Sequence, residues 1–120
     1  MITIERDQNI FIMKIFAPRK RRDETEFRNF LNHLLDEKDF SLLIKVDGEK
    51  NFSHESKVAL NHWFKEHKNF LYEHCRALYR VRDPETFDEK NIIRLKKAFP
   101  FHYDEYQDFD EAYDAISNLK

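Results

Sequence analysis

Two short segments rich in hydrophobic residues, separated by a polar stretch, lie at the start of the chain. Residues 2–5 and 10–16 are rich in β-branched and aromatic side chains, and the polar residues 6–9 separate them. Segments of this composition on either side of a short polar stretch are typical of paired β-strands. The pattern therefore predicts an antiparallel β-hairpin.

The next apolar positions recur every three or four residues, which places them on one face of a helix. They are Phe27, Phe30, Leu31, Leu34 and Leu35. Asp23 and Glu26 have the spacing of a capping box, so we expect the helix to begin there and to end near Glu37. Residues 40–46 form a nearly continuous apolar run, which is typical of a central strand covered on both faces.

The second half of the chain repeats this alternation of helical and extended patterns. We expect a long helix that is capped by Ser53 or Ser56 and ends near His74, followed by a strand over residues 77–81. The Asp83-Pro84 pair predicts the start of a further helix. Residues 101–106 alternate like a half-buried edge strand, and Asp108 predicts the cap of a last helix.

The predicted order is ββαβαβαβα over a single domain, residues 1–120. A hairpin that leads into alternating helices and strands requires a mixed sheet, antiparallel at its start and parallel afterwards, so the fold class is α/β. Functional surfaces of such sheets usually lie beyond the carboxyl ends of the parallel strands. That rim contains residues 47–56 and the turn around Arg82 and Asp83.

Composition narrows the class of protein. Hydrophobic residues make up 41% of the chain and aromatic residues 15%, which is enough apolar material for a folded core. Basic and acidic residues nearly cancel, to a formal net charge of -2, so binding of nucleic acid through overall charge is disfavoured. The longest apolar runs are far shorter than the roughly 20 residues of a transmembrane helix. A single cysteine and the absence of a secretory pattern indicate a cytoplasmic protein.

Three segments resemble the STAS domain family, and more narrowly its SpoIIAA-like branch of small bacterial proteins, some of which have SEC14-like ligand-binding character. They are the strand at residues 42–47 that leads into a long helix, the strand at 75–81 with its basic second residue, and the closing segment 109–113. The resemblance covers nearly the whole chain. It implies a STAS fold and a regulatory role like that of anti-sigma-factor antagonists.

The phosphorylation motif of that family is missing from this chain. Members regulated by phosphorylation carry Asp-Ser-Ser/Thr-Gly at the start of the helix that follows the strand, whereas this sequence has residues 51–56, Asn-Phe-Ser-His-Glu-Ser. The resemblance makes Ser53 the candidate phosphorylation site, with Ser56 the weaker choice. The alternative is that Ser53 acts only as a helix cap.

The reactive residue types do not form a catalytic or metal-binding motif. His62, His67 and His74 lack the spacing of three or four residues that pairs metal ligands on one helix. Cys75 follows a predicted helix C-terminus, where the helix dipole opposes a thiolate, so we expect a buried and unreactive thiol. Gly48 is the only glycine, which excludes a glycine-rich phosphate loop. We expect no metal, no cofactor and no enzymatic activity.

Two features suggest binding surfaces. Arg19, Lys20, Arg21 and Arg22 form the densest run of charge and are either a solvated loop or a patch for anions or anionic lipid. Aromatic side chains gather near the long helix, among them Phe52, Trp63 and Phe70, and belong either to the core or to a pocket or dimer surface.

Two functional hypotheses follow. The first is a regulatory or protein-interaction module that binds an unknown protein partner or a second copy of itself, giving a homodimer. Its candidate contacts are Asp47, Phe52, Ser53, Ser56, Trp63 and Phe70. The alternative is a protein that binds an apolar small molecule or a lipid between the long helix and its neighbour.

Overall fold

The computed structural model describes residues 2–15, 21–46, 58, 62–82, 88–99 and 101–119, with backbone alone for residues 21–24 and 46. Its elements follow the predicted order. They are β1 (Ile2–Asp7), β2 (Ile10–Ile15), α1 (Arg21–Leu34), β3 (Phe40–Val46), α3 (Lys68–His74), β4 (Cys75–Val81), α4 (Glu89–Ala98), β5 (His102–Tyr106) and α5 (Phe109–Ser117). Residues 58 and 62–66 are also helical.

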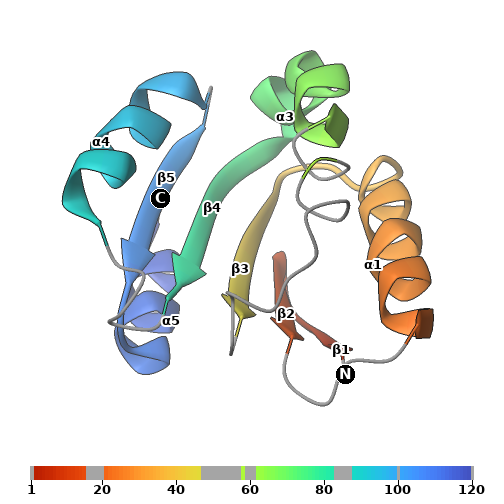
Figure 1. The fold of residues 1–120 in the computed structure, drawn as a ribbon, viewed down its shortest axis with the longest axis horizontal. Helices are drawn as coiled ribbons and strands as arrows, with labels where there is room; N and C mark the ends of the chain where they lie inside the picture. The colour runs from red at the N-terminus through yellow and green to blue at the C-terminus, as the bar shows by residue number, and fades with distance from the viewer. Residues whose placement is uncertain are drawn as a thin grey trace.

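The five strands form one mixed sheet in the order β1-β2-β3-β4-β5 (Figure 1). β1 pairs antiparallel with β2, and each later pair is parallel. The predicted α/β class, with an antiparallel hairpin followed by parallel strands, is confirmed. β3 lies at the centre of the sheet, and β5 is an edge strand in which buried and exposed side chains alternate.

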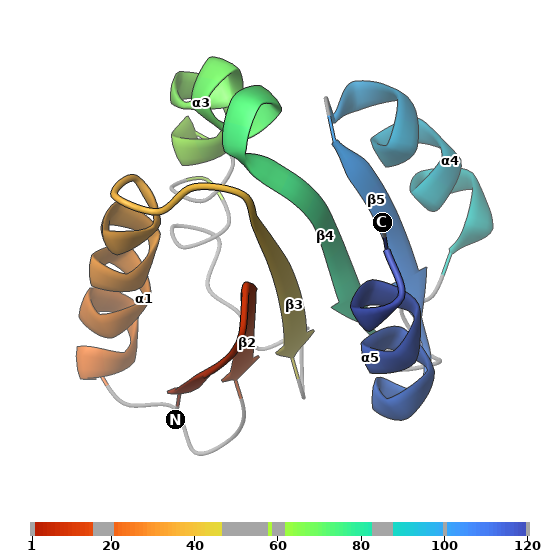
Figure 2. The same ribbon diagram turned by 180° about the vertical axis from the view of Figure 1, so that it is seen from behind.

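Each face of the sheet carries its own hydrophobic cluster. The helices α1 and α3 cover one face, whereas α5 lies across the other (Figures 1 and 2). Successive residues of a strand point to opposite faces. Leu42 of β3 therefore joins the first cluster and Leu43 joins the second, and both are almost fully buried. This arrangement confirms that β3 is covered on both sides.

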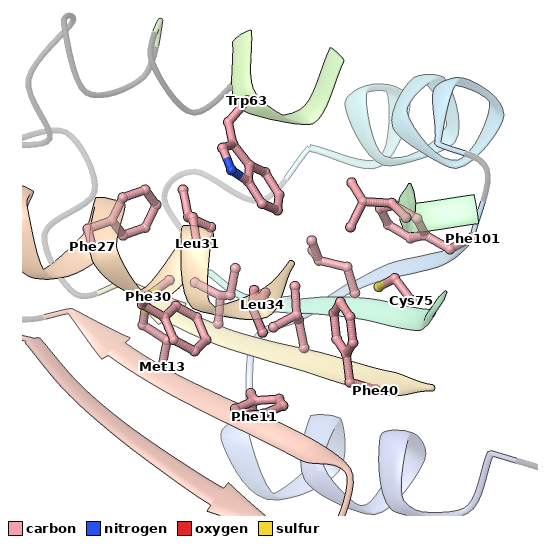
Figure 3. Close-up of a cluster of buried hydrophobic side chains, with 14 of the residues drawn as sticks. Phe11, Met13, Phe27, Phe30, Leu31, Leu34, Phe40, Trp63, Cys75 and Phe101 are labelled. Carbon is pink, nitrogen blue, oxygen red and sulfur yellow. The ribbon is translucent and has the colours of Figure 1, made fainter. Parts of the chain in front are cut away.

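Aromatic side chains fill much of the first cluster (Figure 3). The ring of Phe11 contacts those of Phe30 and Phe40, at centroid distances of 5.9 and 6.2 Å. Edge-to-face and tilted contacts of this kind add to the gain from burying the rings themselves. The high phenylalanine content of the chain is therefore used in part to pack α1 onto the sheet.

The helix α1 is displaced from its predicted bounds. It begins at Arg21, so Asp23 lies within its first turn and is not its N-cap. It ends at Leu34 because the next three residues form tighter turns, in which the amides of residues 35–37 bond to carbonyls three positions back. The prediction of a helix from Asp23 to about Glu37 was therefore two to three residues wrong at each end.

The long helix before β4 is interrupted at His67, which contradicts the prediction of one continuous helix. His67 has φ -108° and ψ 25°, outside the helical range, and α3 starts at the next residue. The backbone bonds from His67 N to Trp63 O and from Leu71 N to His67 O still cross this point. The interruption is thus local, and the predicted caps Ser53 and Ser56 lie outside the described residues.

The helices α4 and α5 begin at aspartate caps. α5 confirms the prediction, since Asp108 accepts a hydrogen bond from the amide of Glu111. α4 instead starts after Asp88, which accepts from the amide of Lys90. The predicted start at Asp83-Pro84 lies outside the described residues. Both caps satisfy an amide that would otherwise lack an intrahelical partner.

Candidate functional site

The carboxyl ends of the four parallel strands meet at one edge of the sheet. The register pairs Ile15 with Val46, and Val81 with both Lys45 and Tyr106. We call this edge the carboxyl edge. Of the predicted binding residues, Asp47, Phe52, Ser53 and Ser56 follow β3 in the chain but lie outside the described residues. Arg82, which directly follows β4, is described.

A buried ionic cluster of Arg82, Glu105 and Tyr103 lies at the carboxyl edge. Arg82 Nε forms an ion pair with Glu105 Oε1, and the Tyr103 hydroxyl donates to Glu105 Oε2 at 2.5 Å. The side chain of Arg82 is 12% exposed and that of Glu105 is 1% exposed. A buried carboxylate is strongly destabilising unless it is paired and hydrogen-bonded. Both oxygens of Glu105 meet this requirement.

The electrostatics of the cluster favour a fixed arrangement over proton transfer. Burial raises the pKa of Tyr103 well above its ordinary value of 10.0, the charge of Arg80 lowers it in part, and the hydrogen bond to Glu105 raises it again. The phenol therefore keeps its proton and remains a donor to Glu105. The cluster anchors β5 to the end of β4, where the connection from Arg82 towards α4 begins.

Glu105 was not predicted to be part of a site, although the alternation of apolar and polar residues in β5 indicates that it is buried. In a strand whose residues alternate between buried and exposed, Tyr103 and Glu105 point to the same side. Tyr103 is buried, so the pattern predicts a buried carboxylate two residues later. Such a group needs a cationic partner, and Arg80 and Arg82 are the nearby cations in the adjacent parallel strand and its extension.

Trp63 and Phe70 lie in or against the core. Trp63 is 8% exposed, and its ring points into the first cluster (Figure 3). Phe70 is half-buried and contacts the ring of Phe40 at 6.2 Å. The structure thus favours the core interpretation for these two aromatic residues. One polar atom stands out, because Trp63 Nε1 is buried and has no hydrogen-bond acceptor within the described part of the chain.

The basic run is only partly described. Arg21 and Arg22 are the first two residues of α1, so the interpretation of the whole run as a loop is wrong for these two positions. Arg19 and Lys20 lie outside the described residues. A cation at a helix N-terminus is opposed by the helix dipole, and a bound anion would relieve that opposition. The anion or lipid patch stays a prediction.

Cys75 is buried at the start of β4, as expected. Burial is the main cause that raises the pKa of its thiol to about 12, and Sγ donates a hydrogen bond to the carbonyl of Ala77. The neighbouring His74 lies near Glu73, with 3.7 Å between Nε2 and Oε2. In the residues that the structure describes, histidine, cysteine and acidic side chains do not gather in groups of three that would suit a metal ion.

A second site lies at the opposite edge of the sheet, where the parallel strands begin. It is a cavity of about 290 Å³ between the β1–β2 turn and the last turns of α5. Its polar lining includes Asp7, Gln8, Ser41, Arg76 and Tyr113, and Ile10 and Ile116 contribute apolar surface. Sequence reasoning missed this cavity because α5 and the hairpin are about a hundred residues apart in the chain.

Within the described residues, none of the helices combines the length and apolar character needed to cross a membrane. No protein-family model matches the sequence, and the search of curated proteins gave no match. A solved structure does match. It is the crystal structure of an uncharacterised protein of the DUF3478 family, with a SpoIIAA-like fold, from Shewanella loihica.

The likeness to the Shewanella protein extends over nearly the full length of both chains. It covers 97% of this chain and 92% of that one, with a TM-score of 0.61 and a sequence identity of 16%. At this identity the comparison speaks to the fold alone. The mixed five-stranded sheet and the order of helices agree with it. This chain therefore has a SpoIIAA-like fold, as its resemblance to STAS domains predicts.

Proposed function

We propose that the protein is a non-enzymatic regulatory module that binds another protein, or a second copy of itself, through the carboxyl edge of its sheet. The observation that carries this proposal is the buried pairing of Arg82 with Glu105. A surface that is already rigid loses less conformational entropy when a partner binds. The cluster holds the ends of β4 and β5 in this way, and the predicted contacts in residues 47–56 follow β3 in the chain.

The chemistry of the edge supports binding over catalysis. A general acid or base needs a pKa near the working pH and access to substrate. Tyr103 retains its proton far above that pH, and Glu105 is buried with both oxygens engaged. The likeness in fold to SpoIIAA adds support, since the STAS resemblance implies a regulatory role.

A second candidate is the binding of an apolar small molecule or lipid beside α3. One observation favours it, namely the buried Trp63 Nε1, which has no acceptor among the described residues. An unsatisfied buried donor costs about 1–3 kcal/mol, and a polar group on a ligand would remove that cost. Against this candidate, the Trp63 and Phe70 rings already pack on Phe64 and Phe40.

The proposal is tested by reversing one charge at each edge of the sheet. Asp47 directly follows β3 in the chain, whereas Asp36 is exposed in the turn before β3, at the amino ends of the parallel strands. Partners cross-linked to the wild-type chain in cells are identified by mass spectrometry and then tested as purified proteins. We expect Asp47→Lys to weaken binding at least about tenfold, and Asp36→Lys to leave it unchanged.

Circular dichroism on both variants confirms that each is folded before binding is compared. Equal binding by the two variants would overturn the assignment of the carboxyl edge. Failure of the wild-type chain to bind any purified candidate would overturn the interaction function itself.

A further inference from the structure

The cavity between the hairpin turn and α5 combines two opposite charges with an apolar wall. Its volume of about 290 Å³ is near the lower limit of the roughly 300–1,000 Å³ typical of small-molecule sites. It lies at the amino ends of the parallel strands, away from the carboxyl edge. Its role is therefore independent of the proposed docking surface.

The cation of the cavity is Arg76, the second residue of β4. Arg76 is exposed, and no carboxylate of the described residues lies within ion-pair distance of it. Its guanidinium presents a planar set of N–H donors that matches the two oxygens of a carboxylate. A cation that lines a cavity and has no carboxylate partner among the described residues is suited to a carboxylate from outside.

The anion of the cavity is Asp7, at the end of β1. Its Oδ2 accepts a hydrogen bond from the Tyr113 hydroxyl, which ties the hairpin to α5. This bond raises the pKa of Tyr113, so the phenol stays protonated and acts as a donor. A carboxylate has about four acceptor positions, and one donor leaves the others available. The remaining oxygen, Oδ1, is suited to a ligand cation such as an ammonium group.

The rest of the lining is partly apolar. Ile10 and Ile116 belong to the second hydrophobic cluster and are largely buried, and both face the cavity together with the half-buried Leu119. These side chains form a surface for a short aliphatic group. Ser41 and Ser117 add hydroxyls that can either donate or accept hydrogen bonds.

From this arrangement we propose that the cavity binds a free aliphatic α-amino acid. Arg76 pairs with its carboxylate, Asp7 with its ammonium, and Ile10 and Ile116 contact its side chain. A zwitterion satisfies both charges at once, whereas a simple acid or amine satisfies one and leaves the other facing an uncharged group. Specificity then comes from the penalty of leaving a charged partner unsatisfied.

The test uses L-leucine and two analogues that each lack one charge. These are 4-methylpentanoate, which has no ammonium group, and 3-methylbutylamine, which has no carboxylate. Each is titrated into the full chain labelled with ¹⁵N, and amide shifts are followed by NMR. We expect the amides of Gln8, Asn9 and Ser117 to shift, and L-leucine to saturate the site at lower concentration than either analogue.

Variants then assign the two charges. Arg76→Gln and Asp7→Asn should each weaken binding of L-leucine at least about tenfold. Asp7→Asn retains an acceptor for Tyr113, which protects the fold. Arg28→Gln, on the exposed face of α1, is the matched control and should bind as the wild type does.

Three results would overturn the proposal. The first is the absence of any shift with L-leucine at millimolar concentration. The second is equal affinity for all three compounds. The third is unchanged binding of L-leucine by Arg76→Gln. This substitution removes the cation proposed to bind the carboxylate of the ligand and does not alter the hairpin.

Discussion

At the scale of single residues, Cys75 shows how burial controls a reactive group. Its thiol has a pKa of about 12 in the folded chain, against an ordinary value of 9.0. The thiol is therefore protonated at neutral pH and is a poor nucleophile. Sequence reasoning predicted this outcome from the position of Cys75 after a helix C-terminus, and the structure supplies burial as the main cause.

The raised pKa of Cys75 predicts a loss of stability in alkali. The unfolded chain releases this proton near pH 9.0, while the folded chain holds it to about pH 12. The stability that the buried, protonated thiol contributes is thus complete below pH 9.0 and is lost as the pH rises towards 12. We expect the free energy of unfolding in urea to fall over this range, and to fall less steeply for Cys75→Ala. Identical slopes for the two proteins would contradict this assignment.

Gln8 occupies a backbone conformation that ordinarily suits glycine. It is in the two-residue turn between β1 and β2, with φ 55°. A side chain in this left-handed region costs roughly 1–2 kcal/mol, whereas glycine adopts it freely. The hydrogen bond from Arg6 Nε to the Gln8 carbonyl, at 2.8 Å, depends only on the backbone.

We therefore expect Gln8→Gly to stabilise the chain by about 0.5–1 kcal/mol, as measured by urea denaturation. Gln107→Gly is the control, since Gln107 is exposed and is not among the described residues with positive φ. It should be neutral or destabilising. Destabilisation by Gln8→Gly would show that the Gln8 side chain makes a contact that outweighs its backbone strain.

At the scale of elements, periodicity predicted the strands and helices but located their ends less well. The strand at residues 40–46 was predicted with its observed bounds, because its apolar run is bordered by polar residues on both sides. The start of α1 was misplaced because Asp23 suits the first turn as well as the cap, and its end was misplaced because residues 35–37 continue in tighter turns. The interruption at His67 has no signal in the apolar pattern, which continues through it.

The ionic cluster joins two elements, β4 and β5, and its loss should be costly. Removing one partner of a buried ion pair leaves the other charge in a low-dielectric environment. We expect Glu105→Gln to destabilise the chain by about 3 kcal/mol in urea denaturation. The matched control is Lys96→Ala, because the Lys96–Asp104 pair, at 3.5 Å, is much more exposed.

Lys96→Ala should cost less than about 1 kcal/mol, as solvent-exposed pairs generally do. A similar cost for both substitutions would mean that the Arg82–Glu105 pair contributes no more than a surface contact. The cluster would then not be the anchor of the carboxyl edge.

At the scale of the whole molecule, the fold was predictable and the candidate sites were only partly so. Alternating strands and helices define a mixed sheet, and the carboxyl edge follows from parallel strands. The cluster around Glu105 and the amino-end cavity depend on which side chains meet across the sheet. That information lies in the packing of distant segments and not in any local pattern.

The homodimer remains a prediction. The burial of aromatic residues near α3 removes one reason for expecting it. The sequence left the aromatic side chains near α3 either in the core or at a pocket or dimer surface, and in the structure Trp63 is buried and Phe70 half-buried. Tyr72, at 71% exposed, is the large apolar residue of α3 that faces solvent. We expect dimers at micromolar concentration that form through the carboxyl edge, so Asp47→Lys should weaken them and Tyr72→Ser, on the helix that leads into the start of β4, should leave them unchanged. A 14.8 kDa monomer alone in sedimentation of the wild type would contradict this.

The proposed function requires the chain to bind a protein and not a lipid. Native mass spectrometry of the chain, purified gently from its own cells, distinguishes the two. We expect species whose extra mass is that of a second polypeptide, either another protein or a copy of this chain. A chain that carries a mass of lipid size, and no second polypeptide, would contradict it.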